Sequence, residues 1–457
     1  MTHASDPRAA RLVDTYLSGS MSRRSFVRGL LALGVSTSVA GSILANASRT
    51  LGQSPPSGLS GEARFLIGPW TDDEVAHQQV IAAAFNQTNP GVKFSFKLYD
   101  WGTQAAEIDA SLAEGAHDVY YFGEGDYANR AVQVDGFEDL TARIDDPAFA
   151  AEKAKYLYWD RIGTYGGKLL GLPLCWHVED ALFVNMDAVK AVGHDETFVD
   201  TWDSFLDAVA KMTKGTDTYG AGIGMQIGGF AEWYQRLRAA GGSYLTADLS
   251  KPNVNLPEVV RATQDMVDLF TKGYAPPLGT YDYNTAPDAF TAGKLATYSS
   301  DLTIAAVLLA KPQPPTFEWA VLPYPPASQP GPAGSRVNFN DIGFLSMGSK
   351  TPDKDLIWEV LKFFSNSDSD AYWSGVSGTY PARIDALDHG YNDYAAPQLG
   401  ASFAQFQQYS VGPEPFPAFG TVEDQAEAQI QQAYSGQISA ADAVANVEKI
   451  VNQEVFG

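Results

Sequence analysis

The chain has 457 residues, and its 31 lysines and arginines against 54 aspartates and glutamates give a net charge of −23. With 45% hydrophobic and 19% charged residues it has the composition of a globular protein of two or three domains, and the acidic excess argues against nucleic acid as a partner, because phosphate contacts need clustered lysine and arginine. A single cysteine, Cys175, excludes an intrachain disulfide and a multi-cysteine metal site.

The first 47 residues have the pattern of a twin-arginine export signal. Arg23-Arg24 precedes an apolar run at 29–44, and Ala45-Asn46-Ala47 offers a small-x-small cleavage site. The run is too short and too rich in glycine and serine for a comfortable membrane span, and an uncleaved N-terminal anchor is the alternative. No cysteine follows the run, which excludes a lipid-anchored lipoprotein. We therefore expect export to the periplasm and cleavage near Ala47.

Cleavage would make the chain more acidic. Residues 1–47 contain five arginines and two aspartates, so the mature chain holds 26 basic and 52 acidic residues, a net charge of −26. Residues 48–61 are rich in serine, proline and glycine and predict a flexible leader. Because no later segment has the ~18 consecutive apolar residues of a membrane span, we expect a soluble mature protein.

The first part of the mature chain alternates predicted strands and helices. Apolar periodicity predicts, in order, a strand at Ala63–Gly68, a helix that begins with a capping box at Thr71, an alternating strand at Val92–Leu98, a helix around Ile108, and a strand at Asp118–Phe122. This β-α-β-α-β order predicts a parallel sheet with right-handed crossovers.

The same alternation continues to the end of the chain, so the protein is predicted to be α/β throughout, with helices on both faces of its sheets. The further elements are a strand at Ala181–Asn185, a helix capped by Thr201, a glycine-rich strand at Tyr219–Met225, a helix from Pro257, a strand at Trp319–Leu322, and helices at Asp353–Phe364 and Ser439–Val455.

The common catalytic and cofactor motifs are absent from the sequence. It has no H-E-x-x-H, G-x-S-x-G or P-loop pattern. The glycines within 220–228 have the wrong spacing for a dinucleotide and favour a strand packed closely on a neighbour. Glu179-Asp180 could be half of a glycosidase carboxylate pair, but nothing places a second carboxylate. Cys175, in an apolar run, is expected to be a buried small hydrophobe. We therefore expect no enzymatic activity, no cofactor and no metal.

Six short phrases follow one another along nearly the whole mature chain. They are Trp70 with Ala84–Val92, Tyr165–Pro173 with Ala181–Asn185, Thr201–Leu206, Phe290–Ala296, Trp319–Pro323 and Gly378–Arg383. In this order they resemble the extracellular solute-binding proteins of carbohydrate ABC transporters, solute-binding protein family 1, which are maltose-binding-protein-like. One departure concerns the loop after the fourth phrase. Family members often have a tryptophan there, whereas this loop reads Tyr298-Ser299-Ser300-Asp301 and favours a hydrogen-bonding contact.

The resemblance implies a type II periplasmic binding protein fold. Two α/β lobes, each a mainly parallel sheet flanked by helices, would be linked by hinges and would close on a ligand in the cleft between them. By the matching phrases, lobe 1 is expected at 62–177 plus 344–378 and lobe 2 at 182–340 plus 383–457. The hinges are expected near 177–181, 340–343 and 379–381.

The loops after the first three predicted strands carry candidate ligand contacts. Ligands of open α/β sheets bind beyond the carboxyl ends of the strands, where this chain has Trp70, Asp72, Trp101 and Glu124. Sugars need such a mixture, because their C–H faces pack on aromatic rings and their hydroxyls donate to carboxylates. Trp70 could instead pack within the lobe, and Asp72 could serve only as a helix cap.

The hinge position and the matching phrases add further candidates. These are His177, Trp233, Asp301, Asn340, Asp341, Tyr380 and Arg383. Three of them have a structural alternative: His177 as a satisfied buried histidine, Trp233 as a core residue of a helix face, and Arg383 as part of a structural ion pair.

The resemblance implies a non-catalytic periplasmic component of an ABC importer. It would bind a sugar, oligosaccharide or polyol, deliver it to permease subunits in the inner membrane, and act as a monomer. Two alternatives remain open. A receptor for a polyamine or another small solute would use the acidic loops without needing the tryptophans, and an exported glycan-active enzyme would need a suitably spaced carboxylate pair.

Overall fold

The structure of the chain is a computed structural model. It describes residues 58–71, 73–101, 103–123, 136–157, 168–223, 230–328, 336–414 and 416–457. The predicted export signal at 1–47 lies outside these residues, as do Asp72 and Glu124. No helix in these ranges has the length and apolar character to cross a membrane.

The chain divides into two compact units. Unit 1 ends at Trp176 and resumes at Ile342–Ala396, and unit 2 consists of His177–Asp341 and Pro397–Gly457. The first two boundaries fall where the phrases place hinges. The third lies between Ala396 and Pro397, so residues 383–396, assigned to lobe 2 from the sequence, belong to unit 1. One 3-10 helix at Ile384–Leu387 and one short α-helix at Tyr391–Tyr394 follow the third expected hinge before the chain leaves the unit. We describe each unit separately.

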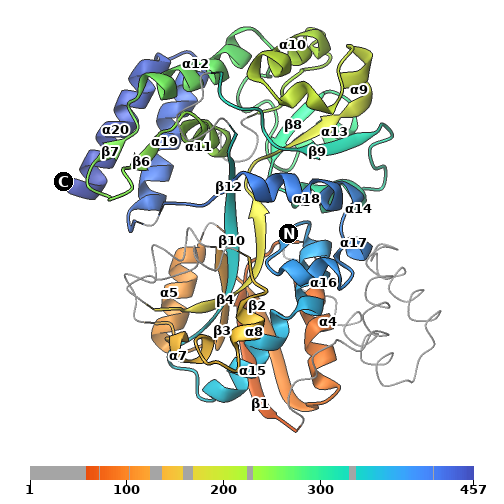
Figure 1. The fold of residues 1–457 in the computed structure, drawn as a ribbon, viewed down its shortest axis with the longest axis vertical. Helices are drawn as coiled ribbons and strands as arrows, with labels where there is room; N and C mark the ends of the chain where they lie inside the picture. Colours follow the sequence, from red (N-terminus) through yellow and green to blue (C-terminus); the bar gives the residue numbers. More distant parts are fainter. Residues whose placement is uncertain are drawn as a thin grey trace. The chain divides into compact units, whose positions relative to one another are not determined.

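A mixed sheet forms the centre of unit 1 (Figure 1). The strands β1, β2 and β3 pair in parallel, which confirms the predicted β-α-β-α-β arrangement. β10 joins β3 antiparallel, and β11 joins β4 antiparallel. The strand order is β11 (Tyr380–Pro381), β4 (Gly171–Val178), β10 (Asn338–Met347), β3 (Val119–Gly123), β1 (Ser60–Ile67) and β2 (Gly91–Leu98). Because β1 begins at Ser60, the last two residues of the predicted leader belong to the sheet.

Helices cover both faces of this sheet, as predicted. Side chains alternate between the faces of a strand, so Phe65 and Ile67 of β1 pack in one core while Leu66 between them packs in another. The described residues of unit 1 contain the helices α4 (Glu74–Asn86), α5 (Gln104–Glu114), α7 (Thr141–Ile144), α8 (Ala150–Lys153), α15 (Lys354–Phe364), α16 (Ser367–Ser377), the 3-10 helix η2 (Ile384–Leu387) and α17 (Tyr391–Tyr394).

Two helix ends in unit 1 have clear caps, and one predicted cap does not form. Gly115 closes α5 at φ 68°, a left-handed conformation that favours glycine, and the Asp353 side chain caps α15. At the start of α4, however, the predicted capping box does not form. Asp73 is the N-cap and no side chain caps the helix, because the Glu74 carboxyl faces the core instead of turning back.

Unit 2 contains a three-stranded sheet of a different kind. β5 (Ala181–Asn185) is fully buried and pairs antiparallel with both β8 (Thr297–Ser300) and β9 (Trp319–Leu322). The prediction of a mainly parallel sheet is therefore wrong for this unit. Strand direction depends on how distant segments return to one another, and the residue pattern of a single strand does not reveal it. Two short strands, β6 (Ser243–Leu245) and β7 (Pro252–Asn253), form a separate antiparallel pair.

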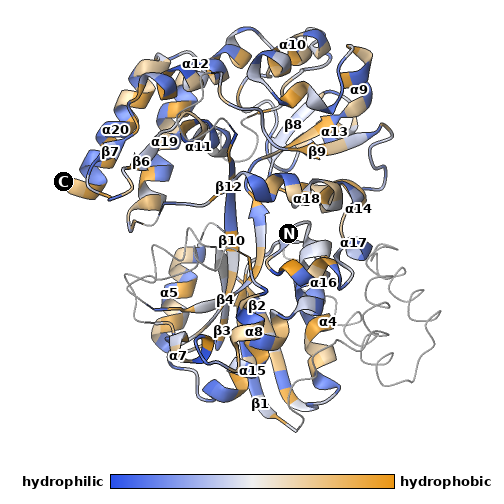
Figure 2. Cartoon of the chain, in the orientation of Figure 1, coloured by the Kyte–Doolittle hydropathy of each residue, from blue (hydrophilic) through white to orange (hydrophobic). Residues whose placement is uncertain are grey.

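Amphipathic helices complete unit 2 (Figure 2). Thr201 caps α10 by accepting from the Ser204 amide at 3.1 Å, and Pro257 begins α12, both as predicted. The helices are α9 (Met186–Ala191), the 3-10 helix η1 (Glu196–Val199), α10 (Trp202–Met212), α11 (Phe230–Ala239), α12 (Pro257–Thr271), α13 (Ala286–Thr291), α14 (Ile304–Ala310), α18 (Pro397–Gln408), α19 (Phe419–Tyr434) and α20 (Ala440–Phe456). A short strand, β12 (Ser410–Val411), pairs with β10.

Two glycines of the 220–228 string lie in very close packing. A Cβ on Gly220 would stand 2.0 Å from the Val209 carbonyl oxygen, and one on Gly222 would stand 2.8 Å from the Thr297 carbonyl oxygen. Only glycine fits such an approach. Tyr219 and Gly222 make isolated parallel bridges, so the described part of the predicted strand is a pair of bridges beside β8.

Candidate functional site

Five aromatic side chains gather in unit 1, and we call Trp70, Tyr99, Trp101, Tyr121 and Trp373 the aromatic group. The Trp70 ring lies 5.4 Å from the Trp101 ring at 89°, an edge-to-face arrangement. Its centroid is also 5.4 Å from Tyr121 and 6.3 Å from Trp373. Tyr99 packs edge-to-face against Trp101, with ring centroids 5.2 Å apart at 79°. Such contacts are favourable for ring quadrupoles and hold each ring in one orientation.

Strand register explains why the two outer tryptophans meet. β1 and β2 are parallel and their last residues, Ile67 and Leu98, are direct partners. Trp70 and Trp101 each lie three residues beyond that pair, so the two loops leave the same edge of the sheet side by side. This is the carboxyl edge at which the sequence predicts ligand contacts.

Gly68 provides the space that the aromatic group needs. A Cβ at this position would lie 2.7 Å from the Tyr99 hydroxyl oxygen, 2.8 Å from the ring of Trp101 and 3.0 Å from the Trp70 indole nitrogen. Real Cβ atoms do not approach other atoms so closely. The rings therefore pack directly over the backbone where β1 ends, and the glycine is required by their proximity.

Trp101 differs in exposure from the other tryptophans. Among the eight tryptophans of the described ranges, Trp101 is 48% exposed and Trp70 half-buried, whereas the remaining six are at most 8% exposed. Leaving a large apolar ring in water forgoes about 1.5–3 kcal/mol of burial free energy. A rigidly supported, exposed indole beside a strand end is suited to pack against an apolar face of a ligand.

A buried carboxyl group holds the base of the aromatic group. Glu74 is 0% exposed, and its Oε1 accepts from the Trp373 indole N–H and from the Gln78 amide, both at 2.8 Å. Burial raises the pKa of Glu74 to about 7, and these two hydrogen bonds lower it by less. His77, one turn along α4, is also buried, which lowers its pKa to about 4, and it contacts the Tyr372 hydroxyl at 3.1 Å.

We expect Glu74→Gln to change how stability depends on pH. The folded-state pKa of about 7 lies above the ordinary value of 4.5, so the folded state binds more protons between these values and its stability falls as pH rises through this window. The shift corresponds to about 3 kcal/mol. Glutamine keeps an acceptor but cannot ionise. The variant should therefore gain stability relative to the parent between pH 4.5 and 7, measured by urea unfolding at several pH values.

The exposed Glu114 serves as the matched control for this experiment. Glu114→Gln should leave the pH dependence parallel to that of the parent protein. Parallel curves for Glu74→Gln and the parent would contradict the assignment of a raised pKa to Glu74.

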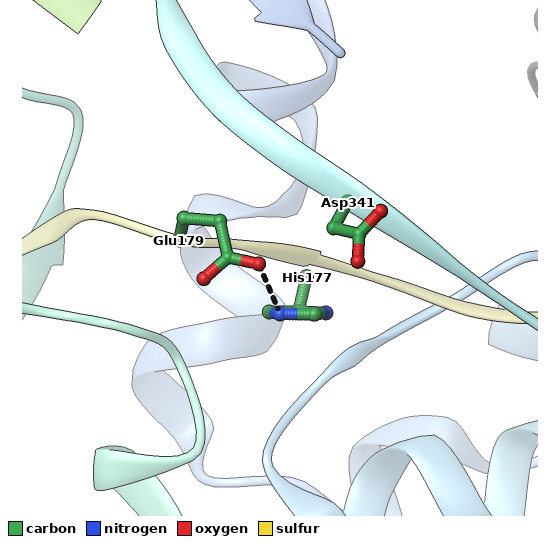
Figure 3. A group of neighbouring side chains, drawn as sticks. All are labelled: His177, Glu179 and Asp341. Carbon is green, nitrogen blue, oxygen red and sulfur yellow. Dashed lines mark ion pairs between the residues drawn. The ribbon is translucent and has the colours of Figure 1, made fainter. Parts of the chain in front are cut away.

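A polar group in unit 2 includes three of the predicted contacts. His177 is 3% exposed and forms an ion pair with Glu179, with 2.8 Å between Nε2 and Oε1 (Figure 3). Asp341 offers its carboxylate to the same place. Burial raises the pKa of Asp301, hydrogen bonds from Thr303 lower it, and the charges of His177 and Glu179 act on it in opposite directions. Asp301 therefore lies within electrostatic reach of the group.

The neighbouring Asp180 is buried in a network of its own. It is 2% exposed and accepts from the Gln235 amide at 2.6 Å and from the Ser299 hydroxyl. Burial and, after it, the charge of Glu232 raise the pKa of Asp180 well above its usual value. With its oxygens already engaged, the Asp180 carboxyl anchors the start of β5 to α11 and β8. The glycosidase role that was open for Glu179-Asp180 gains no support from this position.

Comparison with known proteins decides the family. The pattern of the bacterial extracellular solute-binding proteins matches residues 80–399, more than two thirds of the chain. The chain belongs to this family. This confirms the resemblance drawn from the six phrases.

Solved structures of similar fold confirm the predicted two-lobed α/β fold of this solute-binding protein. Maltose-bound MalE3 of T. maritima superposes with a TM-score of 0.72 at 20% identity, covering 86% of this chain and 99% of that one. An ABC substrate-binding protein of Listeria monocytogenes in complex with cycloalternan has a TM-score of 0.73 at 17% identity, covering 86% and 99%. A Thermotoga lettingae solute-binding protein bound with α-D-tagatose has a TM-score of 0.70 at 20% identity, covering 86% and 100%.

Arg383 of this solute-binding protein is engaged in structural interactions. Its guanidinium, 1% exposed, donates to Glu152 at 2.7 Å and to Asp385 at 3.2 Å, and it lies 4.7 Å from the centroid of the Tyr156 ring. Its backbone N–H donates to Asp370 at 2.8 Å. The structure thus gives Arg383 the structural ion pair that the sequence left as an alternative, and its contact with a ligand stays a prediction.

Three other predicted contacts are fully buried side chains. Trp233 is 0% exposed in the core of unit 2, and its indole N–H donates to the Thr263 hydroxyl at 2.9 Å, so it is a core residue and not an exposed aromatic. Tyr380 is 0% exposed and packs on Trp176, with ring centroids 4.6 Å apart. Asn340 is 0% exposed within β10.

Some of the side chains predicted as ligand contacts lie together in the structure, and others lie apart from them. The structure brings Trp70 and Trp101 together in unit 1, and His177 and Asp341 together in unit 2. Tyr121, Trp373 and Glu74 support the first pair but carried no signal, because each lies in an ordinary strand or helix pattern. Asp72 and Glu124 lie outside the described residues and stay predictions.

Proposed function

We propose that this protein is the substrate-binding component of an ABC importer and that its ligand is a sugar, oligosaccharide or polyol. The observation that carries the proposal is that Trp101, a member of the aromatic group, is exposed to solvent. Three similar structures contain bound maltose, cycloalternan and tagatose, which supports the same class of ligand here.

The chemistry of the aromatic group fits a neutral sugar. A pyranose ring presents several C–H bonds on one face, and these pack well on the electron-rich face of an indole. Trp70 stands at right angles to Trp101, so the two rings would contact different sides of a bound sugar. Asp72 and Glu124, which follow β1 and β3 in the sequence, remain the proposed acceptors for sugar hydroxyls.

We further propose the cellular setting that the sequence predicts. The twin-arginine pattern at 1–47 would direct the folded protein to the periplasm. There it would act as a monomer, without catalysis, and would deliver its ligand to permease subunits. The ligand would have to bind the closed state of the protein better than the open state in order to drive closure.

A ligand panel tests the class of ligand. Sugars, oligosaccharides, polyols and polyamines would be screened by tryptophan fluorescence and thermal shift, because a ligand that binds only the folded state raises the melting temperature. We expect at least one sugar or polyol to change both signals. A response to polyamines alone would overturn the carbohydrate assignment, and conversion of a glycan to products would favour the enzyme.

Trp101→Ala tests the proposed contact directly. Burial of a large side chain against a ligand is worth about 1.5–3 kcal/mol, so the affinity for the sugar identified in the panel should fall by about ten- to a hundredfold. Because Trp101 is 48% exposed, the melting temperature without ligand should change little. Isothermal titration calorimetry would give the affinity.

Phe456→Ala is the matched control, because Phe456 is 46% exposed and lies at the end of α20 in unit 2. It should leave the affinity unchanged. Equal affinities of the Trp101→Ala variant and the parent would remove Trp101 from the site while leaving the ligand class intact.

A further inference from the structure

Three potential metal ligands converge in unit 2. One ring nitrogen of His177 and one carboxylate oxygen each from Glu179 and Asp341 all lie within 4.8 Å of one another. Figure 3 shows the three side chains turned toward one another from two neighbouring strands. Among the described residues, no other group of three or more histidine, cysteine, aspartate or glutamate side chains meets this spacing.

Backbone pairing fixes the places from which these ligands come. His177 is the penultimate residue of β4, Glu179 follows the end of that strand, and Asp341 lies in β10, the neighbour of β4 in the sheet order. The Glu179 amide donates to the Phe339 carbonyl at 2.9 Å, which ties the residues after β4 to β10. The convergence therefore rests on main-chain hydrogen bonds and not only on side-chain rotamers.

We propose that His177, Glu179 and Asp341 bind a divalent transition-metal ion of the zinc class. Zn²⁺ takes histidine nitrogen at about 2.0–2.1 Å and carboxylate oxygen at about 2.0–2.2 Å, so tetrahedral ligand atoms stand roughly 3.3 Å apart. In the structure the three ligand atoms lie within 4.8 Å of one another, so the side chains would have to move inward on binding the ion. Three protein ligands leave the fourth position to water or to a bound solute.

The imidazole decides which metals fit the group. Ca²⁺ and Mg²⁺ are bound by oxygen ligands, whereas an imidazole with carboxylates suits zinc and its first-row neighbours. The Glu179 and Asp341 carboxylates beside the imidazole supply the negative charge that a divalent cation would balance.

A second histidine–carboxylate pair in unit 2 differs from the His177 group in the number of nearby ligands and in burial. His194 and Asp207 lie 2.7 Å apart, as close as His177 and Glu179, but no third ligand joins them within the spacing above among the described residues. His194 is also more exposed, at 19% against 4% for His177. The pair is a surface ion pair, whereas the His177 group combines burial with a third ligand.

The proposed ion would join two segments at which the chain passes between the units. His177 is the first residue after the boundary at Trp176, and Asp341 is the last before the boundary at Ile342. Cross-linking these segments would stabilise unit 2 when the ion is bound. This role goes beyond the binding and delivery of a sugar. It assigns His177 and Asp341, which the sequence predicts as sugar contacts, to the binding of an ion.

Zinc titration of the full-length protein tests the proposal. After treatment with EDTA and dialysis, isothermal titration calorimetry with Zn²⁺ should show one site, and Zn²⁺ should raise the melting temperature. His177→Gln, Glu179→Gln and Asp341→Asn should each weaken Zn²⁺ binding by at least about tenfold. Ca²⁺ should bind more weakly than Zn²⁺ at the same site.

His194→Gln is the matched control and should leave the Zn²⁺ affinity unchanged. If the buried His177 variant does not fold, the titrations of the parent, Glu179→Gln and Asp341→Asn still decide the question. Absence of Zn²⁺ binding by the parent, or parental affinity in the Glu179 and Asp341 variants, would overturn the site. Sugar binding by EDTA-treated protein is measured separately. If the protein binds sugar but not Zn²⁺, the metal site is wrong while the proposed function stands.

Discussion

Trp233→Ala should lower the free energy of unfolding by about 3–5 kcal/mol, as expected when a large buried aromatic side chain is truncated. The Trp233 side chain is 0% exposed and lies in the core that α11 shares with α12 and α19. Truncation would leave a cavity and would remove the indole hydrogen bond to the Thr263 hydroxyl. Denaturant unfolding, followed by circular dichroism, would measure the loss.

Trp101→Ala provides the comparison, because the same substitution at a 48% exposed position removes few protein contacts. The two variants should behave in opposite ways. Trp233→Ala loses stability, whereas Trp101→Ala loses ligand affinity. A Trp233→Ala protein of parental stability that no longer binds sugar would restore the ligand contact predicted from the sequence.

Arg383→Met should lower the free energy of unfolding by about 3 kcal/mol. Removing one partner of a buried ion pair leaves the others without compensation, at a cost of about 3–5 kcal/mol. The lower end applies because Glu152 and Asp385 are each 22% exposed and can be partly solvated. The substitution also removes the cation–π contact with Tyr156. Urea unfolding at neutral pH would measure the effect.

Arg143 is a matched control within the same unit. It pairs with Asp355 at 2.6 Å and lies 5.9 Å from the centroid of the Trp358 ring, but the arginine is 31% exposed and its partner 89%. Arg143→Met should therefore cost less than about 1 kcal/mol. Similar costs for the two variants would contradict a structural role for Arg383, and a loss of sugar affinity without a loss of stability would support the ligand contact.

Local pattern was sufficient for the part of unit 1 that carries the aromatic group. β1, β2 and β3 and the helices between them have clear periodicity, and parallel pairing follows from their order. Once Ile67 and Leu98 are paired, the positions of Trp70 and Trp101 follow from counting residues. Both were predicted for this reason. Their support by Trp373 and Glu74 was not, because those contacts join segments almost 300 residues apart.

The same reasoning failed where the outcome depended on packing. Trp101 and Trp233 are the same residue type next to polar neighbours, yet one is half exposed and the other fully buried. β5 has the apolar run expected of a parallel strand but pairs antiparallel on both sides. Arg383 lies in a phrase that suggested a ligand contact, and only Glu152, 231 positions earlier, shows its structural role.

The sequence by itself determined the class of protein, the β-α-β-α-β start and the two tryptophans at the carboxyl edge of its strands. Each of these depends on short-range periodicity, on the order of residues or on short sequence motifs. The tertiary structure alone decided which aromatic side chains are exposed, which arginine is neutralised, and that His177, Glu179 and Asp341 meet. These outcomes depend on burial and on distances between atoms far apart in the chain. The physics that governs them, desolvation and close packing, acts only after the chain has folded.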